Sequence, residues 1–235
     1  MTVTSLTASS QTVQAQTDHP LAPLASEDTM PHPALQAAWE DYQTLSQELT
    51  FSSVEGESDN ITTIDDILDT YDFDAELEEK TINDNEEQLI YHYQFANPED
   101  AGSPDKARIL FHFMDEQLLM IGLFNGIHLA SADYFMSPEA TYDIFTNGAS
   151  IDELAEHQPQ VTAMAEMVFQ DEPVSMLISF SGESVEDAMT DFFIVKEGQV
   201  VDVFQTEMAA GATGFEQLAI EGFLTYFHNV GEASN

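Results

Sequence analysis

The sequence predicts an α+β protein with two tandem modules, each made of two helices and a four-stranded antiparallel sheet, and with a C-terminal helix after them. Apolar residues recur every three to four positions in some segments and at every second position in others, which are the periods of helices and strands. These segments follow the same order twice along the chain. The 235 residues, 43% of them hydrophobic, are enough for one large or two small domains with a packed core.

The first module is expected to cover residues 34–125. The apolar stripe that begins at Leu35 predicts a helix over 34–50. Thr63 can cap a second helix, 63–71, because acidic residues follow it in the first turn. The period then falls to two, and strands are expected at 75–82, 87–96, 106–114 and 117–124.

The second module, 137–205, repeats this order. Ser137 is followed by proline and predicts the start of a helix at 138–147. Ser150 begins a capping box and predicts a short helix at 151–157. The four strands that follow are expected at 161–169, 173–181, 188–195 and 199–205.

A further helix is expected at 214–229, where Thr213 and Glu216 can form a capping box after a glycine-containing break. The clearest internal match places Ile64-Asp65-Asp66 beside Ile151-Asp152-Glu153, at a spacing of about 80–90 residues. That spacing is too long for a solenoid and indicates a duplicated domain.

This arrangement resembles the β-lactamase-inhibitor-protein-like fold, in which two tandem modules of this kind form a saddle. The resemblance covers about residues 34–205. It rests on the element order, on the duplicated helix start and on the aromatic hairpins that begin at Ile109 and Asp191. The secreted inhibitors carry a disulfide in each module, whereas this sequence has no cysteine and an additional C-terminal helix. The resemblance therefore implies the fold, and no inhibitory target is carried over.

Residues 1–33 differ from the rest of the chain. The first 17 residues carry no charged side chain, and four prolines follow, so a disordered tail is expected. Val13 and Ala15 stand at the −3 and −1 positions of an A-x-A-like cleavage site, so 1–15 is interpreted as a secretory-signal remnant that begins upstream. The end of this segment resembles the ends of signal peptides in exported proteins of Gram-positive lactic acid bacteria. We expect a secreted or cell-envelope protein, or a cytoplasmic one if Met1 is the true start.

The charge excludes several functions. Forty-four acidic and four basic side chains give a formal net charge of −40. So few cations cannot neutralise a phosphate backbone or hold an anionic membrane, so neither direct nucleic-acid binding nor membrane adhesion is expected. No apolar run reaches the length needed to cross a membrane. The lack of cysteine excludes a disulfide framework, a thiolate zinc site and a cysteine nucleophile.

Sequence motifs for catalysis and metal binding are missing. There is no G-x-S-x-G, no phosphate-binding glycine loop and no H-E-x-x-H, and the seven histidines are scattered. The acidic run 72–78 resembles a calcium loop only superficially, because Leu77 replaces the turn glycine and Asn83 the bidentate glutamate. Neither an enzyme, a metal nor a cofactor is predicted.

One sheet face of the first module is the candidate partner-binding surface. Ile109, Phe111, Phe113, Leu119, Ile121 and Leu123 are expected to face the helices. The opposite face, with Leu118, mixes apolar, histidine, amide and basic side chains, which suits a concave binding surface. The alternative interpretation is that this face packs against the other module or the C-terminal helix. The candidate binding residues are Ile90, His92, Gln94, Arg108, Leu110, His112, Met114 and Met120.

The predicted function is that of a non-catalytic, exported, acidic protein-binding module, either an inhibitor or a cell-envelope accessory protein. Its charge would keep it soluble and monomeric. The alternative is an acidic DNA mimic that inhibits a nucleic-acid-binding protein, and a third interpretation is salt adaptation. Crowded carboxylates raise one another's folded-state pKa, so stability is expected to increase from pH 7 towards about pH 4.5.

Overall fold

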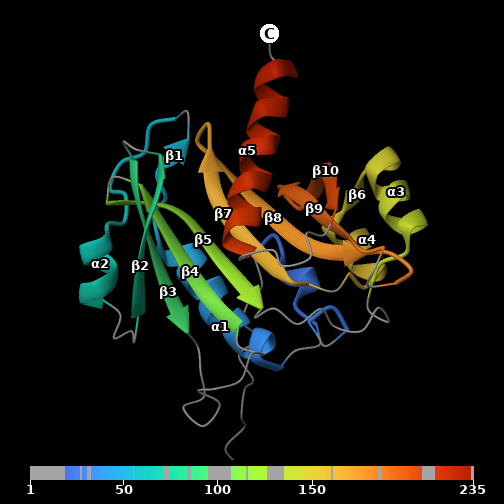
Figure 1. Cartoon of the computed structure of the whole chain (residues 1–235), viewed down its shortest axis with the longest axis horizontal. Helices are drawn as coiled ribbons and strands as arrows, with labels where there is room; N and C mark the ends of the chain where they lie inside the picture. The colour runs from blue at the N-terminus through green and yellow to red at the C-terminus, as the bar shows by residue number, and fades with distance from the viewer. Residues whose placement is uncertain are drawn as a thin grey trace, which may run out of the picture.

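A single sheet of antiparallel strands forms the frame of the molecule (Figure 1). The computed structural model describes residues 19–26, 28–30, 33–54, 56–70, 75–83, 86–94, 107–114, 116–125, 135–159, 161–184, 187–207 and 215–233. The long strands within these residues lie in the order β2-β3-β4-β5-β7-β8-β9-β10. Their bounds are β2 (Ala75–Asn83), β3 (Glu86–Gln94), β4 (Ala107–Met114), β5 (Gln117–Asn125), β7 (Ala163–Phe169), β8 (Glu172–Ser181), β9 (Met189–Lys196) and β10 (Gln199–Glu207).

The sheet is continuous between its first four and last four long strands, because β5 pairs with β7. Met120 lies opposite Met167 in that pairing, and Leu123 lies opposite Met164. Two short strands complete the sheet. β1 (Ser53–Val54) pairs with β7 in parallel, and β6 (Ala149–Ser150) pairs with β10 antiparallel.

Helices cover both faces of the sheet. One hydrophobic cluster joins its first face to η1 (Ala22–Leu24), α1 (Pro33–Glu48), α2 (Ile64–Thr70), α3 (Pro138–Asn147) and α4 (Ile151–Glu156). A second cluster joins the other face to α5 (Phe215–Ala233), which crosses the front of the sheet in Figure 1. The predicted α+β class is confirmed, and each expected helix and strand is present with its ends moved by a few residues.

Helix α5 lies close to the sheet because of its sequence. Ala219, Phe223 and Tyr226 recur at helical spacing and are buried in the second cluster. A Cβ on Gly222 would come within 2.8 Å of Met176 Cε, so a larger residue there would require the Met176 side chain to move. The helix extends to Ala233, beyond the expected end at 229, while Thr213 lies outside the described residues. None of the described helices is both long enough and apolar enough to span a membrane.

The alternation along β4 and β5 follows the prediction except at one place. Leu118 packs in the first cluster, the helix-covered cluster formed with η1 and α1–α4, whereas Leu119 packs in the second cluster with α5. The expected positions of these two residues are therefore exchanged. The reason is a β-bulge. His112 lies opposite Met120, but Phe113 lies opposite Leu118, which leaves Leu119 as an extra residue. An inserted residue reverses the faces of those that precede it in the strand.

The N-terminal prediction is wrong for residues 19–26 and 28–30. These residues were expected in a disordered tail over 1–33, but three of their side chains are fully buried in the helix-covered cluster. Burial of apolar surface offsets the entropy cost of ordering the segment despite its prolines. The first 18 residues, with the expected signal remnant 1–15, lie outside the described residues. The buried side chains are Leu21, Leu24 and Met30.

A polar contact also fixes this N-terminal segment. His19 Nε2 lies 2.9 Å from Glu166 Oε1 on β7, and Ser175 Oγ donates to the same oxygen at 3.0 Å. The His19 ring packs edge-on against Trp39 of α1, with centroids 4.9 Å apart. The segment therefore joins α1 to the middle of the sheet.

Candidate functional site

The register brings the residues of the predicted binding face together. Ile90 lies opposite His112, His92 opposite Leu110, and Gln94 opposite Arg108. His112 also lies opposite Met120 in the next strand. Residues that face each other across antiparallel strands share a side of the sheet. The pairing of 87–96 with 106–114, on which the prediction depended, is therefore present.

Three residues of this face are nevertheless buried. Leu110, His112 and Met120 are at most 2% exposed. Leu110 and Met120 belong to the cluster that includes α5, so for them the alternative of packing against the C-terminal helix is correct. They cannot present a surface to a partner. Met114 is half-buried, and the side chains of Ile90, His92, Gln94 and Arg108 lie outside the described part of the structure.

His112 illustrates why this face is not a reactive site. Its Nδ1 is buried without a hydrogen bond. Burial lowers the pKa of His112 to about 4, because an imidazolium would lose its hydration. The ring is therefore neutral at pH 7 and is enclosed by the protein.

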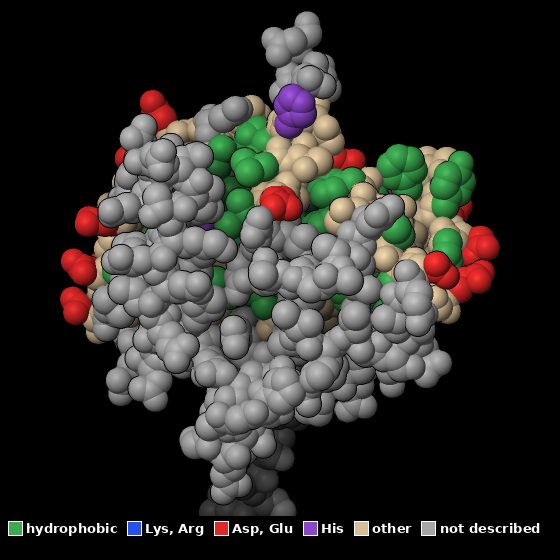
Figure 2. All heavy atoms as spheres, viewed as in Figure 1, with side chains coloured by type: hydrophobic (Ala, Val, Ile, Leu, Met, Phe, Trp, Pro, Cys, Tyr) green, Lys and Arg blue, Asp and Glu red, His purple; other side chains and the backbone are tan. Residues whose placement is uncertain are grey.

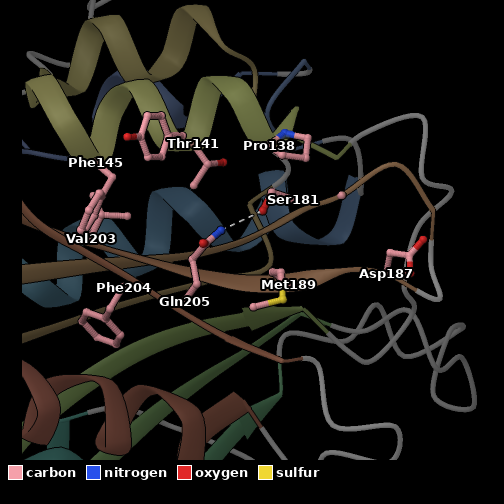
Figure 3. Close-up of a pocket in the computed structure, with 11 residues that line it drawn as sticks. Pro138, Thr141, Phe145, Ser181, Asp187, Met189, Val203, Phe204 and Gln205 are labelled. Atoms are coloured by element: carbon pink, nitrogen blue, oxygen red, sulfur yellow. Dashed lines mark hydrogen bonds between the residues drawn. The ribbon is translucent and has the colours of Figure 1, made fainter.

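A pocket of about 540 Å³ lies elsewhere, between α3 and the strands β8, β9 and β10 (Figure 3). Its volume is within the range of about 300–1,000 Å³ in which proteins bind small ligands or inserted side chains. No Lys or Arg is among the described residues that line it. The lining consists of Pro138, Thr141, Tyr142, Phe145, Ser181, Gly182, Asp187, Met189, Val203, Phe204 and Gln205.

The local sequence fixes the orientation of α3 over this pocket. Ser137 Oγ accepts a hydrogen bond from Ala140 N at 3.2 Å and caps the helix, as the sequence predicts. Thr141 and Ile144 are buried against the sheet. At helical spacing this leaves Tyr142 and Phe145 on the outer side, where they are 68% and 62% exposed. Two large aromatic side chains thus stand in solvent beside the pocket.

A buried carboxylate underlies the pocket. Asp191 of β9 is fully buried and faces Gln205 of β10 and Ser179 of β8. Ser181 Oγ donates to Asp191 Oδ1 at 3.0 Å, and Gln205 Nε2 donates to the same oxygen at 2.6 Å. Gln205 Nε2 is also 3.2 Å from Ser181 Oγ, the contact drawn in Figure 3. Ser181 and Gln205 line the pocket, so Asp191 holds its polar wall in place.

The environment of Asp191 changes its acidity. Burial raises the pKa of Asp191 to about 6, against the lowering effect of the hydrogen bonds from Gln205 and Ser181. The side chain of Thr141, on α3, adds a smaller lowering effect on the same pKa. The group is mainly a carboxylate at pH 7 and mainly a carboxylic acid at pH 5.

The described lining of the pocket is mainly apolar and aromatic. Ser181 directs its hydroxyl to the Asp191 carboxylate, and no histidine is among the described residues that line the pocket. Within the described residues, no three His, Asp or Glu side chains are placed to hold a metal ion. What the site offers is exposed aromatic surface, a cavity and hydrogen-bond acceptors.

The sequence contained a usable signal for this surface. The cap at Ser137 fixes where α3 begins, and Gly148, with φ 72°, ends it. If Ile144 must face the core, Tyr142 and Phe145 must face outward, so the exposed aromatics follow from the helical period. The pocket itself depends on the hairpin β9–β10 beside α3, which is a tertiary contact that no local pattern encodes.

Comparisons with known proteins give little on function. No family model matches the sequence, and no curated protein matches it. Among solved structures, the chain is similar to a crystal structure from Streptococcus mutans described as a "putative beta-lactamase inhibitor protein". The identity is 13% and the TM-score 0.37, over 72% of this chain and 96% of that chain. This name agrees with the resemblance stated from the element order, but a likeness this low carries no argument about function.

Proposed function

We propose that the chain is a non-catalytic, exported protein-binding module that binds its partner through α3 and the adjoining pocket. The observation that carries the proposal is the exposure of Tyr142 and Phe145 at the mouth of the cavity. Aromatic side chains dominate the binding energy of protein interfaces, above all beside pockets that a partner can fill. In Figure 2, hydrophobic and acidic side chains gather at the end of the molecule that carries α3.

The remaining surface supports this choice. Of the large hydrophobic side chains in the described residues, those most exposed are Tyr142, Phe145, Val201 and Leu224. Two of these four stand three residues apart on α3, whereas Val201 is on β10 and Leu224 on α5. Two large apolar side chains that lie together in solvent form a patch that a partner can cover.

The proposal includes the two-module organisation, with modules at 34–125 and 137–205. Corresponding helix starts make the same contacts. Ser150 Oγ accepts from Glu153 N at 3.2 Å, and Thr63 Oγ1 accepts from Asp66 N at 3.3 Å. The backbone N–H of the following isoleucine then bonds to the last hairpin of its own half.

In the second half, Ile151 N donates to Gly198 O at 3.0 Å, and Ser150 lies opposite Gln199. In the first half, Ile64 N donates to Glu116 O at 3.2 Å, and Thr63 lies opposite Gln117. Equivalent residues thus occupy equivalent positions against equivalent hairpins. We infer that gene duplication produced this correspondence.

The proposal also includes a secreted or cell-envelope location, which the signal-like residues 1–15 support.

The alternative function is an acidic mimic of nucleic acid. Its support is the net charge of −40. A mimic would bind through many distributed carboxylates and would not depend on the aromatic residues of α3. The two functions therefore differ in which substitutions abolish binding.

A photo-cross-linking residue at position 145, used with the exported protein fraction of the native host, tests the proposal. A matched probe at Asp152, an exposed position on α4, is the control. The proposal expects a defined adduct from position 145 alone, with a partner whose affinity falls at least about tenfold in Phe145→Ser. A partner that binds Phe145→Ser normally and is displaced by duplex DNA would support the mimic.

A further inference from the structure

The mouth of the pocket is acidic as well as aromatic. Glu139 and Asp143 are exposed elsewhere on α3 and add negative charge near the pocket without lining it. Asp187, from the connection between β8 and β9, lines the opposite edge (Figure 3). An anionic ligand would be repelled by these carboxylates, and the field of the whole chain would add to the repulsion.

The polar wall of the pocket favours a hydrogen-bond donor. The amide nitrogen of Gln205 donates to both Ser181 and Asp191, so the atom of this amide left to bind a ligand is its carbonyl oxygen, an acceptor. Ser181 already donates its proton to Asp191. A wholly apolar occupant would leave such acceptors buried and unpaired, which costs free energy.

The apolar wall favours a side chain with a long hydrocarbon part and a flat head. Phe145, Val203 and Met189 also line the pocket. Arginine packs its methylene groups on such surface and stacks its guanidinium on aromatic rings. Its five N–H groups would meet the acceptors described above.

We propose that the pocket receives an arginine side chain of a cationic protein segment, with Phe145 and Tyr142 stacking on it and Asp187 pairing with its charge. This inference rests on the proposed function and names the chemistry of the partner. A second copy of the chain is a poor occupant, because two acidic α3 surfaces would repel each other.

The test is a binding titration with a short acetylated peptide that has one central arginine flanked by leucine and glycine. The comparison peptide carries citrulline, which has the same shape without the charge. We expect the citrulline peptide to bind about tenfold more weakly at about 0.15 M salt, where distant charges are screened. Phe145→Ser and Asp187→Asn should each weaken the arginine peptide by a similar factor.

Two variants provide matched controls. Asp152→Asn removes one exposed carboxylate on α4, and Leu224→Ser removes one exposed apolar side chain on α5. Both should bind the arginine peptide as the wild-type chain does. If Asp152→Asn weakens it as much as Asp187→Asn, the attraction is general and the arginine pocket is refuted.

The two proposals fail in different ways. If the arginine and citrulline peptides bind equally, or neither binds, the arginine inference is overturned. The partner found by cross-linking at position 145 would still establish a protein-binding surface. If instead the arginine peptide binds as expected but no partner adduct forms, the pocket chemistry stands and the proposed function fails.

Discussion

Two surfaces of this protein mix apolar and polar side chains, and only one of them faces solvent. On the first, around His112, Leu110 and Met120 are buried beneath the cluster that α5 completes. On the second, Tyr142 and Phe145 project from α3 into water. The difference is the presence of a covering helix, so a mixed strand face indicates a binding surface only when no other element packs on it.

The largest expected effect compares the aromatic residues of these two regions. Phe223 of α5 is 2% exposed and packs in the second cluster, so Phe223→Ala should lower the free energy of unfolding by about 3–5 kcal/mol. Phe145→Ala should change it by less than about 0.5 kcal/mol, because its ring is mostly in water. Urea unfolding measures both. If both variants lost the same free energy of unfolding, the exposed side of α3 would contribute to the stability of the fold.

The second prediction concerns Asp191 and acid. Its folded-state pKa of about 6 lies above the ordinary value of 3.8, so it stabilises the fold at low pH and loses that contribution as the pH rises through 6. Asp191→Asn should therefore remove up to about 3 kcal/mol of the stability gained between pH 7 and pH 4. Melting curves at several pH values test this, and an unchanged pH profile in the variant would contradict it.

His112 should act in the opposite direction. Its pKa is lowered to about 4 from 6.5, so the unfolded chain takes up a proton first and stability falls as the pH drops below about 6.5. His112→Leu should leave stability at pH 7 within about 1 kcal/mol and raise it by about 2–3 kcal/mol at pH 4.5. The net change in stability towards acid is then the sum of the contributions of carboxylate crowding, Asp191 and His112. Denaturant titrations of the variant at both pH values measure the difference.

The smallest effect compares the two halves of the chain. Thr63→Ala and Ser150→Ala should each cost about 1 kcal/mol, because each removes one helix cap. The hydroxyl and backbone N–H of Ser150 lower the pKa of Glu153, and those of Thr63 lower the pKa of Asp66. Both carboxyl pKa values should therefore rise in the variants, which NMR titration can follow. If only one of the two variants lost stability, the two helix caps would not have equivalent roles.

Local patterns predicted most of the fold. Capping at Ser137 and Ser150 and the helical stripe at Ala38 and Tyr42 depend only on neighbouring residues, and the structure contains all of them. Three features depend on contacts distant in sequence. These are the exchange of Leu118 and Leu119 by a bulge, the burial of Leu21, and the packing of Leu110 in the cluster that includes α5.

The candidate site also combines features that depend on neighbouring residues with features that depend on contacts distant in sequence. The outward direction of Tyr142 follows from the helical period of α3 alone. The network of Ser181, Asp191 and Gln205 comes from three strands, and its members show no spacing that a single sequence could mark. Charge and composition predicted a protein as the partner. The location of the pocket could be found only from the folded structure.

The pairing of β5 with β7 has a consequence for handling the protein in pieces. Within the described sheet, each of these strands shields the hydrogen-bonding edge of the other, and both strands carry buried side chains on both faces. A fragment that ends after β5 would carry a long, apolar, unprotected edge, which is a template for intermolecular strand addition. In the uncut chain the pairing of β5 with β7 covers both of these edges, so neither is open to another chain.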